Sequence, residues 1–494
     1  MKHFPLTTSV LLAASLSGCT VGPDYHAPSP VVPDAWTERA RTDAAHPDGP
    51  WWTSFNDPIL DDLVTKAAGA NTDLRIAVQR LQEARAQRGV VSSAGFPQVD
   101  LNGSFSNSRF SENGFLQGLG GSGSGGLPGA IVPGQQINLW QAGVDASWEL
   151  DLFGRNRRAV QAADADIAAD EFGVGDVLVA VIAEVADGYA QLRGIQASLE
   201  VAHRTLTSQQ ETLSVVNEQA AAGVASDLEV SRSQTQVSTT AARIPELESA
   251  AQGAIRRLEV LIGAMPGTLD TQLSAACPLP HAPEALDVGI PSEVLRRRPD
   301  VRAAERRLAA ATARIGVATA DLFPRFSLTG SFGLQSQEIG DLPAGDSRFW
   351  AIGPSVRWPI LDFGRIRSNI RVQDARTAQA LAAYEGTVLR ALSDVEVSLV
   401  RLSRERARAG QLQQAADSAR RSVTLATELY RGGLLEFLDL LDAQRTQFLA
   451  EEAATQANTA IVTDTVALYR ALGGGWENQR AVDLSSRLYG KDIR

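Results

Sequence analysis

Apolar and polar residues alternate one by one in residues 99–106, 144–150 and 326–335. A period of two is typical of β-strands with one apolar face. Two pairs of tryptophans are spaced eight positions apart in or near such segments: Trp140 and Trp148, and Trp350 and Trp358. Eight strand residues span about 26 Å, near the height of an outer-membrane apolar band with aromatic girdles. An ordinary soluble sandwich fits the strands as well.

A seven-residue apolar repeat marks two much longer segments. Its positions are Leu178, Val185, Leu192, Leu199, Leu206 and Leu213 in the first segment, and Leu381, Val388, Val395, Leu402, Ala409, Ala416, Val423 and Tyr430 in the second. A sustained period of seven predicts coiled-coil packing. No proline interrupts residues 154–223 or 364–433, so each segment predicts a helix of roughly 100 Å. A coiled-coil rod alone does not explain the strands.

The chain carries this pattern twice. Residues 73–77, 96–97 and 103–105 recur 227 positions later, whereas Trp148 and residues 153–155 recur 210 positions later. The second offset also relates Gly223 to Gly433, and the change of offset falls in a longer Gly-rich loop of the first copy. Each repeat therefore predicts a helix of about 25 residues, two strands, a very long helix, a glycine turn and a second long helix.

These patterns divide the chain into six parts. We expect a signal peptide at 1–18, a lipid-anchored tether at 19–57, repeat 1 at 58–264, a linker at 265–290, repeat 2 at 291–474 and a C-terminal tail at 475–494. The tether is rich in proline and tryptophan, which is typical of an extended segment that docks on a folded body.

Composition excludes several classes of function. Lys and Arg number 46 against 57 Asp and Glu, so the net charge of −11 offers no basic excess for nucleic acid. Two cysteines and five scattered histidines rule out a disulfide framework and predict no metal site. The Gly-Ser tract 118–126 contains a GxGxxG spacing, but no following helix supports a dinucleotide site. We expect no cofactor, no catalytic residues and no enzyme activity.

The N-terminus predicts export. Lys2 and His3 precede an apolar run from Phe4 to Leu16 that is too short to span a bilayer, which is typical of a secretory signal. The run ends in Leu-Ser-Gly-Cys19, which resembles a bacterial lipobox, so Cys19 is the predicted acylation site. Acyl chains there would anchor the mature N-terminus without a spanning helix. By the same resemblance, Thr20 favours sorting to the outer membrane.

Counting strands predicts an oligomer. One chain supplies four amphipathic strands, whereas the smallest membrane barrels need about eight. An open sheet in lipid leaves both edges unpaired at several kcal/mol per unmet polar group. Two copies give a barrel filled by its own side chains. Three copies give twelve strands, room for water, and six long helical hairpins to extend the tube.

The whole mature chain resembles the TolC-type outer-membrane efflux proteins, in their OprM/NodT-like lipoprotein branch. The residues that carry the resemblance are 19–25 (Cys-Thr-Val-Gly-Pro-Asp-Tyr), 51–58, 71–85 and 295–302 (Leu-Arg-Arg-Arg-Pro-Asp-Val-Arg). In the last of these motifs Pro299 suits a first helical turn and Asp300 suits the positive end of the helix dipole. We interpret that motif as structural.

The resemblance implies a mixed α and β membrane protein. Its trimer would join a twelve-stranded β-barrel in the outer membrane of a Gram-negative bacterium to a long α-helical barrel in the periplasm. The implied partners are a periplasmic adaptor and an inner-membrane pump, most often of the resistance-nodulation-division type. The implied function is passive export of drugs or other small molecules. A type I protein secretion channel and a non-conducting envelope lipoprotein remain alternatives.

Candidate functional residues lie mostly at the helix turns. Asp439 and Asp442 are three residues apart and share one helix face, and the resemblance implies a carboxylate ring that gates the periplasmic end. Glu229 is the repeat-1 counterpart of Asp439. The resemblance also implies adaptor contacts at four tip residues, Gly223, Val224, Gly433 and Leu434. Residues 226–229 fit a capping box that restarts the helix.

Overall fold

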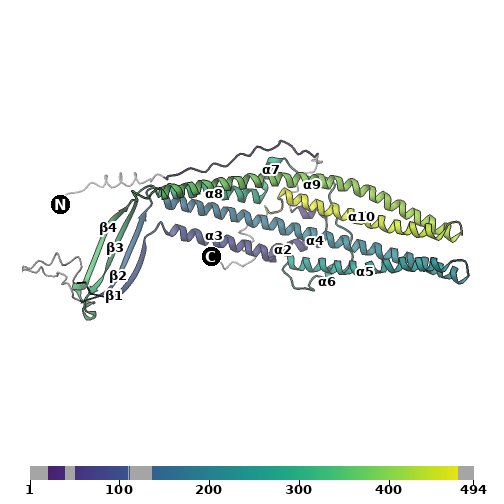
Figure 1. Cartoon of the computed structure of the whole chain (residues 1–494), viewed down its shortest axis with the longest axis horizontal. Helices are drawn as coiled ribbons and strands as arrows, with labels where there is room; N and C mark the ends of the chain where they lie inside the picture. The colour runs from purple at the N-terminus through teal and green to yellow at the C-terminus, as the bar shows by residue number, and fades with distance from the viewer. Residues whose placement is uncertain (1–19, 39–49, 110, 112–135, 287, 477–494) are drawn as a thin grey trace, which may run out of the picture. The chain divides into compact units, whose positions relative to one another are not determined.

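The computed structural model of the chain describes residues 20–38, 50–109, 111, 136–286 and 288–476 (Figure 1). The predicted signal peptide, Cys19 and the Gly-Ser tract lie outside the described residues. The segment before the first repeat contains η1 (Trp51–Phe55). The first repeat contains α2 (Pro58–Ala70), α3 (Thr72–Ser93), β1 (Gln98–Arg109), β2 (Gln136–Leu150), α4 (Arg155–Ala221) and α5 (Asp227–Leu261). The remainder contains α6 (Asp270–Leu273), α7 (Pro291–Arg297), α8 (Pro299–Ala320), β3 (Arg325–Ser336), η3 (Ile339–Asp341), η4 (Gly345–Ser347), β4 (Arg348–Arg357), α9 (Arg365–Arg431) and α10 (Phe437–Leu472).

The two repeats match residue for residue in several elements. Helices α3 and α8 are 22 residues each, and both bounds differ by 227 positions. Helices α4 and α9 are 67 residues each, with bounds 210 positions apart. At 1.5 Å per residue, 67 residues make about 100 Å of helix. The predicted duplication and the predicted helix length are both confirmed.

The four strands form one antiparallel sheet in the order β1-β2-β3-β4, visible as four neighbouring arrows in Figure 1. Each strand follows its neighbour in the chain, and β2 pairs with β3 through couples such as Trp148 and Leu328. The alternating pattern therefore predicted strands correctly. Strand β4 ends at Arg357, one residue before Trp358, because Pro359 has no N–H for a ladder there.

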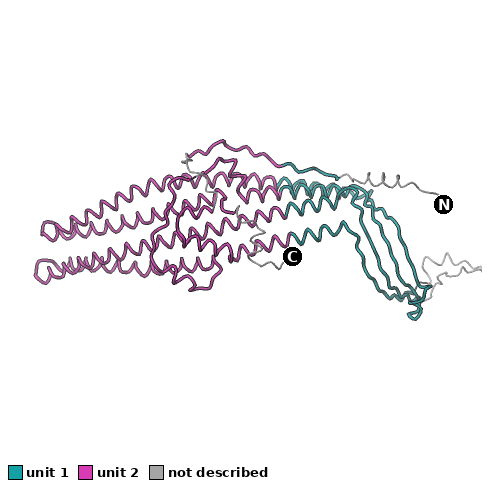
Figure 2. Tube along the Cα trace, turned by 180° about the vertical axis from the view of Figure 1, so that it is seen from behind, with its two compact units in different colours: residues 1–26, 85–166, 308–379 teal, residues 27–84, 167–307, 380–494 magenta. Residues whose placement is uncertain are grey.

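Two compact units divide the described chain, and both draw on each repeat (Figure 2). Unit 1 contains the four strands with the adjoining parts of α3, α4, α8 and α9. Unit 2 contains the other parts of these four helices, the remaining α-helices, the two hairpin turns and the linker. Among the described residues, no helix is both long enough and apolar enough to cross a membrane.

The main hydrophobic core lies in unit 2. Trp51, Trp52 and Phe55 are 3%, 6% and 2% exposed, and the Trp51 ring stacks on Tyr469 with centroids 4.9 Å apart. Seven-residue repeat positions fill much of the rest, since Leu178, Val185 and Leu192 are each 0% exposed. Aromatic and aliphatic burial of this extent is the main source of stability in such a core.

Candidate functional site: the two hairpin turns

The first hairpin turn joins α4 to α5. Gly223 has a φ of 75°, a left-handed conformation that glycine adopts without Cβ strain. Its N–H donates to Ala220 O at 2.9 Å, and Val224 N–H donates to Gln219 O at 2.8 Å. These two bonds form a Schellman motif, which ends α4 and satisfies its last carbonyls.

The returning helix α5 starts with the predicted capping box. Ser226 N–H donates to Glu229 Oε2 at 2.8 Å, and Glu229 N–H donates to Ser226 Oγ at 3.4 Å. The Glu229 carboxylate is therefore engaged by the backbone of its own helix start. This is the position at which sequence analysis placed a gate residue.

The second turn, between α9 and α10, repeats the first with a different cap. Gly433 has a φ of 70°, and Leu434 N–H donates to Leu429 O at 2.9 Å. Glu436 occupies the N-cap of α10 without a side-chain cap hydrogen bond. Instead, Phe437 is 3% exposed and its ring lies 5.8 Å from that of Tyr430. Here aromatic packing takes the place of the capping box.

Asp439 and Asp442 lie on the exposed face of α10. Phe437, Leu440 and Gln444 are 3%, 1% and 5% exposed, so this row turns toward the neighbouring helices. Both aspartates are exposed, and they sit one helical turn apart. The structure thus brings Asp439 and Asp442 together. It places Glu229 on the other hairpin, with its carboxylate already bonded.

Tyr430 links the two hairpins next to their turns. Its hydroxyl donates to Gln219 Oε1 at 2.6 Å, which joins α9 to α4. Burial raises the pKa of the Tyr430 hydroxyl, and the negative charge of Glu229 raises it further. The hydroxyl therefore stays protonated and keeps its proton for Gln219. Sequence analysis recognised Tyr430 only as the last position of an apolar repeat.

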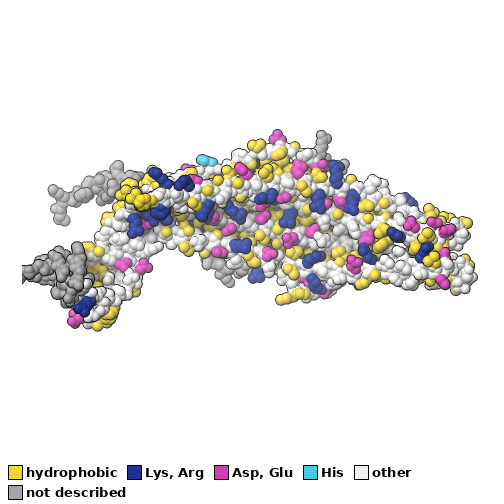
Figure 3. Space-filling view, in the orientation of Figure 1, with side chains coloured by type: hydrophobic (Ala, Val, Ile, Leu, Met, Phe, Trp, Pro, Cys, Tyr) yellow, Lys and Arg dark blue, Asp and Glu magenta, His cyan; other side chains and the backbone are white. Residues whose placement is uncertain are grey.

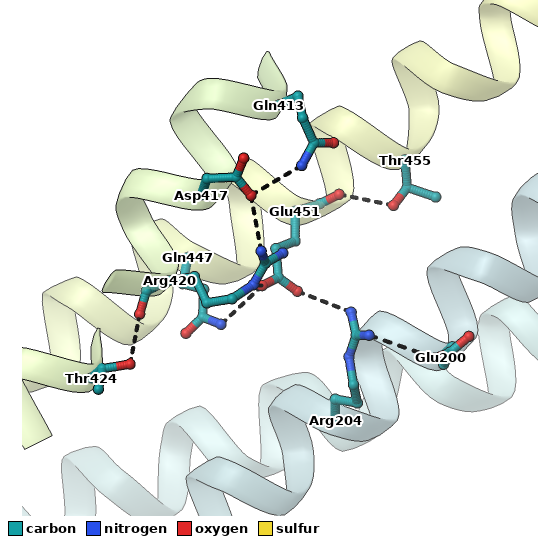
Figure 4. A network of polar contacts seen from close by, with 9 residues as sticks. All are labelled: Glu200, Arg204, Gln413, Asp417, Arg420, Thr424, Gln447, Glu451 and Thr455. Carbon is teal, nitrogen blue, oxygen red and sulfur yellow. Dashed lines mark hydrogen bonds and ion pairs between the residues drawn. The ribbon is translucent and has the colours of Figure 1, made fainter. Parts of the chain in front are cut away.

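A charged network joins the hairpins farther from the turns (Figure 4). Glu451 of α10 is 6% exposed and accepts from Arg204 of α4 at 3.2 Å and from Arg420 of α9 at 3.0 Å. Next to it, Arg243 of α5 donates to Glu452 at 2.6 Å. Helix α10 is therefore ion-paired with three different helices. The two guanidinium partners offset part of the free energy lost when the Glu451 carboxylate is removed from water.

A polar cavity of about 290 Å³ adjoins this network. Arg204, Gln209, Arg420 and Glu451 are among its lining residues. Gln209 is 2% exposed, and within the described chain neither atom of its side-chain amide has a hydrogen-bond partner. A cavity of this size and polarity can hold several water molecules, which would satisfy the amide.

The outer surface of the turns is apolar. Val224 and Leu434, the residues after the two glycines, are 78% and 77% exposed. Figure 3 shows hydrophobic side chains at the end of unit 2 where the turns lie, with acidic and basic side chains around them. Exposed apolar side chains ringed by charge are typical of a protein-docking surface.

The segment that follows Cys19 is held against unit 1. The guanidinium of Arg158, whose side chain is 6% exposed, donates to Val21 O at 3.1 Å, Gly22 O at 3.2 Å and Asp24 Oδ1 at 2.8 Å. Two of its partners are backbone carbonyls, which leave no trace in an apolar pattern. Sequence analysis therefore missed this contact.

The four tryptophans proposed as an aromatic girdle occupy different environments within unit 1. Trp140 lies in β2 and packs on Phe105, with ring centroids 4.3 Å apart. Trp148 and Trp358 are 37% and 56% exposed, and each donates its indole N–H to a backbone carbonyl. Trp350 in β4 is 74% exposed. All four keep at least part of an apolar ring available to a surrounding phase.

The described residues also include few groups that could bind a metal ion or form a disulfide. Among the described residues, no group of three or more His, Cys, Asp or Glu is arranged to hold a metal ion. Cys277 is a free thiol of intermediate exposure. The turns offer charge, hydrogen bonds and an apolar surface, which suit the docking of another protein.

The family model for the outer membrane efflux protein matches residues 63–264 and 290–474, which is more than half of the chain and covers both repeats. Outer membrane protein OprJ of Pseudomonas aeruginosa is 33% identical over 484 residues, which are 96% of this chain and 97% of OprJ. The cation efflux system protein CusC of Escherichia coli is 28% identical over 470 residues, which are 94% of this chain and 98% of CusC.

Solved structures agree with these relatives. The outer-membrane channel OprN superposes with a TM-score of 0.83 at 37% identity, covering 93% of this chain and 100% of that chain. A membrane protein from Pseudomonas aeruginosa gives a TM-score of 0.82 at 32% identity, covering 94% and 99%. The chain therefore belongs to the outer membrane efflux protein family, and it is a non-enzymatic channel of the Gram-negative outer membrane that extends into the periplasm and serves an efflux pump.

Proposed function

We propose that three copies of this chain form the exit duct of a tripartite efflux system. Their twelve strands would close a β-barrel in the outer membrane, and their six hairpins would form the periplasmic tube. A periplasmic adaptor would connect the tube to an inner-membrane pump of the resistance-nodulation-division type. The duct is passive, because the pump supplies the energy.

The observation that carries the trimer is the open sheet. A chain that serves as an outer-membrane channel contributes four described strands with an edge at β1 and another at β4. Unpaired edges are not tolerated in lipid, and about eight strands enclose no more than their own side chains. Three copies are the smallest number that leaves a water-filled lumen. A native mass of one chain in detergent would contradict the proposal.

We propose small molecules as the cargo. Relatives carry names for antibiotic, toluene and cation efflux, and all of these are small solutes. A strain without this chain should accumulate more of several drugs and dyes than its parent strain. Complementation should restore export. Unchanged accumulation across the panel, together with the loss of a secreted protein, would favour the type I secretion alternative.

We propose that Asp439 and Asp442 act as the cation-selective gate. Three copies would form two adjacent rings of three carboxylates each, since both residues lie exposed on one face of α10 and one helical turn apart. A ring of carboxylates concentrates cations and repels anions. Glu229 has a smaller part, because its carboxylate is bonded to Ser226 N–H.

Single-channel recording tests the gate. The variant Asp439→Ala/Asp442→Ala should lose most of its preference for K⁺ over Cl⁻ and should conduct more. The matched control is Glu211→Ala/Glu248→Ala, which also removes two exposed carboxylates per chain, but from α4 and α5. Equal selectivity in the two variants would contradict the assignment.

We propose that the two turns receive the adaptor. Val224 and Leu434 follow Gly223 and Gly433 and expose apolar side chains that desolvate on docking. A Val224→Cys variant should cross-link to adaptor cysteines in a working pump, whereas Val260→Cys, 69% exposed near the far end of α5, should not. Cross-linking at position 260 alone would move the contact away from the turns.

We propose that Cys19 carries acyl chains. The guanidinium of Arg158 holds residues 21, 22 and 24 on unit 1, a few positions after Cys19. That contact would hold an anchored N-terminus next to the sheet-bearing unit. Labelling with radioactive palmitate should mark the wild type and spare Cys19→Ser. A labelled Cys19→Ser variant would place the modification elsewhere.

A further inference from the structure

The two edge strands of the sheet present unmatched surfaces. Strand β1 has β2 on one side, and β4 has β3 on one side, in the part of the chain that the structure describes. Leu101 of β1 is 83% exposed, while Trp350 and Ile352 of β4 are 74% and 70% exposed. Edges of this kind pair with another strand unless something blocks them.

The two repeats make the same contact at the base of their strands. Trp148 Nε1 donates to Gly95 O at 2.9 Å, and Trp358 Nε1 donates to Leu322 O at 3.0 Å. The tryptophans are 210 positions apart, and the two acceptors are 227 positions apart. The offsets found in the sequence therefore also relate contacts in space.

A different contact joins repeat 1 to repeat 2. Phe153, which follows β2, stacks on Phe323, which precedes β3, with centroids 4.6 Å apart and planes inclined by 20°. Applying the two offsets converts this pair into Phe363, which follows β4, and Phe96, which precedes β1. Phe363 is 93% exposed and Phe96 is 67% exposed. Phe363 and Phe96 are therefore much more exposed than Phe153 and Phe323, which stack on each other.

We propose that a second copy of this chain supplies that cover through a defined seam. In this seam Phe363 of one copy stacks on Phe96 of the next, and β4 pairs antiparallel with β1 of the next copy. The inference rests on the proposed assembly of several copies, and it adds the residues and register of their contact.

The register follows from the pairing of β2 with β3. Trp148 lies opposite Leu328, and the two offsets convert this pair into Trp358 opposite Leu101. In the same way Asp145 opposite Ser331 becomes Ser355 opposite Ser104. The same two offsets convert the stacked pair Phe153 and Phe323 into Phe363 and Phe96. The strand pairing and the ring stacking therefore specify one register.

Side-chain chemistry supports this register independently. Trp358 follows β4 directly and continues its apolar side, and Leu101 lies on the apolar face of β1. Ser355 and Ser104 lie on the polar faces of β4 and β1. A slip by one residue would turn apolar residues against polar ones along the whole seam. On the polar face, Arg357 falls opposite Asn102, within diagonal reach of the next acidic residue in β1, Asp100.

The seam is head-to-tail, because the β1 edge of one copy meets the β4 edge of another. Contacts of this type generate closed rings when the rotation closes. A ring leaves no free edge, which is the condition for a sheet in lipid. The seam therefore requires each copy to use both edges at once.

Cysteine cross-linking tests the register in the full-length protein in membranes. In a Cys277→Ser background, Ser104→Cys/Ser355→Cys places thiols opposite each other, where Cβ atoms lie about 5 Å apart. A short bifunctional thiol reagent should convert most chains into covalent dimers and larger rings. The control Ser108→Cys/Ser355→Cys is four residues out of register, about 13 Å along the strand. Its yield should be about tenfold lower.

An intrachain pair calibrates the reagent. Asp145→Cys/Ser331→Cys is the repeat counterpart of the test pair and is opposite within one chain. The reagent should link the two thiols of this variant within one chain, so that both thiols are consumed and no covalent dimer forms. The seam is overturned if the out-of-register control forms covalent multimers as readily as the test pair. It is also overturned if the test pair forms none although the protein is oligomeric. Either result would leave the proposed trimer standing. A monomeric protein in detergent would overturn both.

Discussion

The bends that lead from the strands into the long helices differ between the repeats. Gly154 and Gly364 have nearly the same φ, 78° and 84°. A Cβ on Gly154 would meet Thr20 Cα at 2.9 Å, whereas a Cβ on Gly364 would meet nothing within 4 Å among the described atoms. Phe153 is stacked and Phe363 is 93% exposed. The duplication fixes the backbone of the bend, while its surroundings are specific to each repeat.

Arg158 provides the largest contrast, because its counterpart 210 positions later is Ser368. Arg158→Ala removes charged hydrogen bonds to Val21 O, Gly22 O and Asp24, which should cost the docked segment about 3 kcal/mol. Amide exchange at Val21, which donates to Phe153 O, should accelerate about a hundredfold. Ser368→Ala should leave this exchange unchanged. If the Val21 amide stays protected from exchange in Arg158→Ala, other contacts hold the segment.

The next largest difference is expected between the glycines of the two bends, Gly154 and Gly364. Gly364→Ala should lower the free energy of unfolding by about 1–2 kcal/mol, the strain of a left-handed backbone alone. Gly154→Ala adds a clash with the Thr20 backbone and should lower it by about 2 kcal/mol more. Thermal unfolding of the detergent-solubilised protein measures both. Equal losses would mean that residue 20 moves aside freely.

Two double-mutant cycles compare the phenylalanine pairs. Truncating Phe153 and Phe323 to alanine should reveal a coupling of about 0.5–1.5 kcal/mol within one chain. The same cycle on Phe363 and Phe96 should reveal similar coupling only in the dissociation of the assembly. The first coupling should be independent of protein concentration. Coupling of Phe363 to Phe96 in a dissociated chain would refute the contrast.

The indole hydrogen bonds should show the smallest difference. Trp148→Phe and Trp358→Phe each remove one N–H donor from a backbone carbonyl, so each should lower stability by about 1 kcal/mol. Chemical unfolding of the two variants should agree within error. A marked inequality would show that the repeats are not equivalent at this position.

Periodicity predicted the elements well because it reports which face of an element is buried. The offsets of 227 and 210 positions relate α3 to α8 and α4 to α9 to the residue. The end of β4 was less predictable, since Trp358 continues the alternation but Pro359 stops the ladder. Alternation describes side chains, whereas a strand ends where backbone pairing ends.

Site contacts were less predictable because they join distant residues without a period. Gln219 gives no signal that it meets Tyr430, which lies 211 positions away. Arg158 binds mainly carbonyls, so its partners have no side-chain signature. The capping box at Ser226 and Glu229 was predictable because it is local. Short-range chemistry can be read from a sequence, whereas pairing across the fold needs coordinates.

The equal lengths of α4 and α9 have a consequence for how such a chain can change. Each helix has 67 residues, and the hydrogen bond between Gln219 and Tyr430 requires their ends to stay level. Deleting one heptad from α4 alone would displace its end by about 10 Å. Deleting a heptad from all four helices of the two hairpins would keep the ends level. Shortening in nature should therefore arise as matched deletions in both halves of the chain.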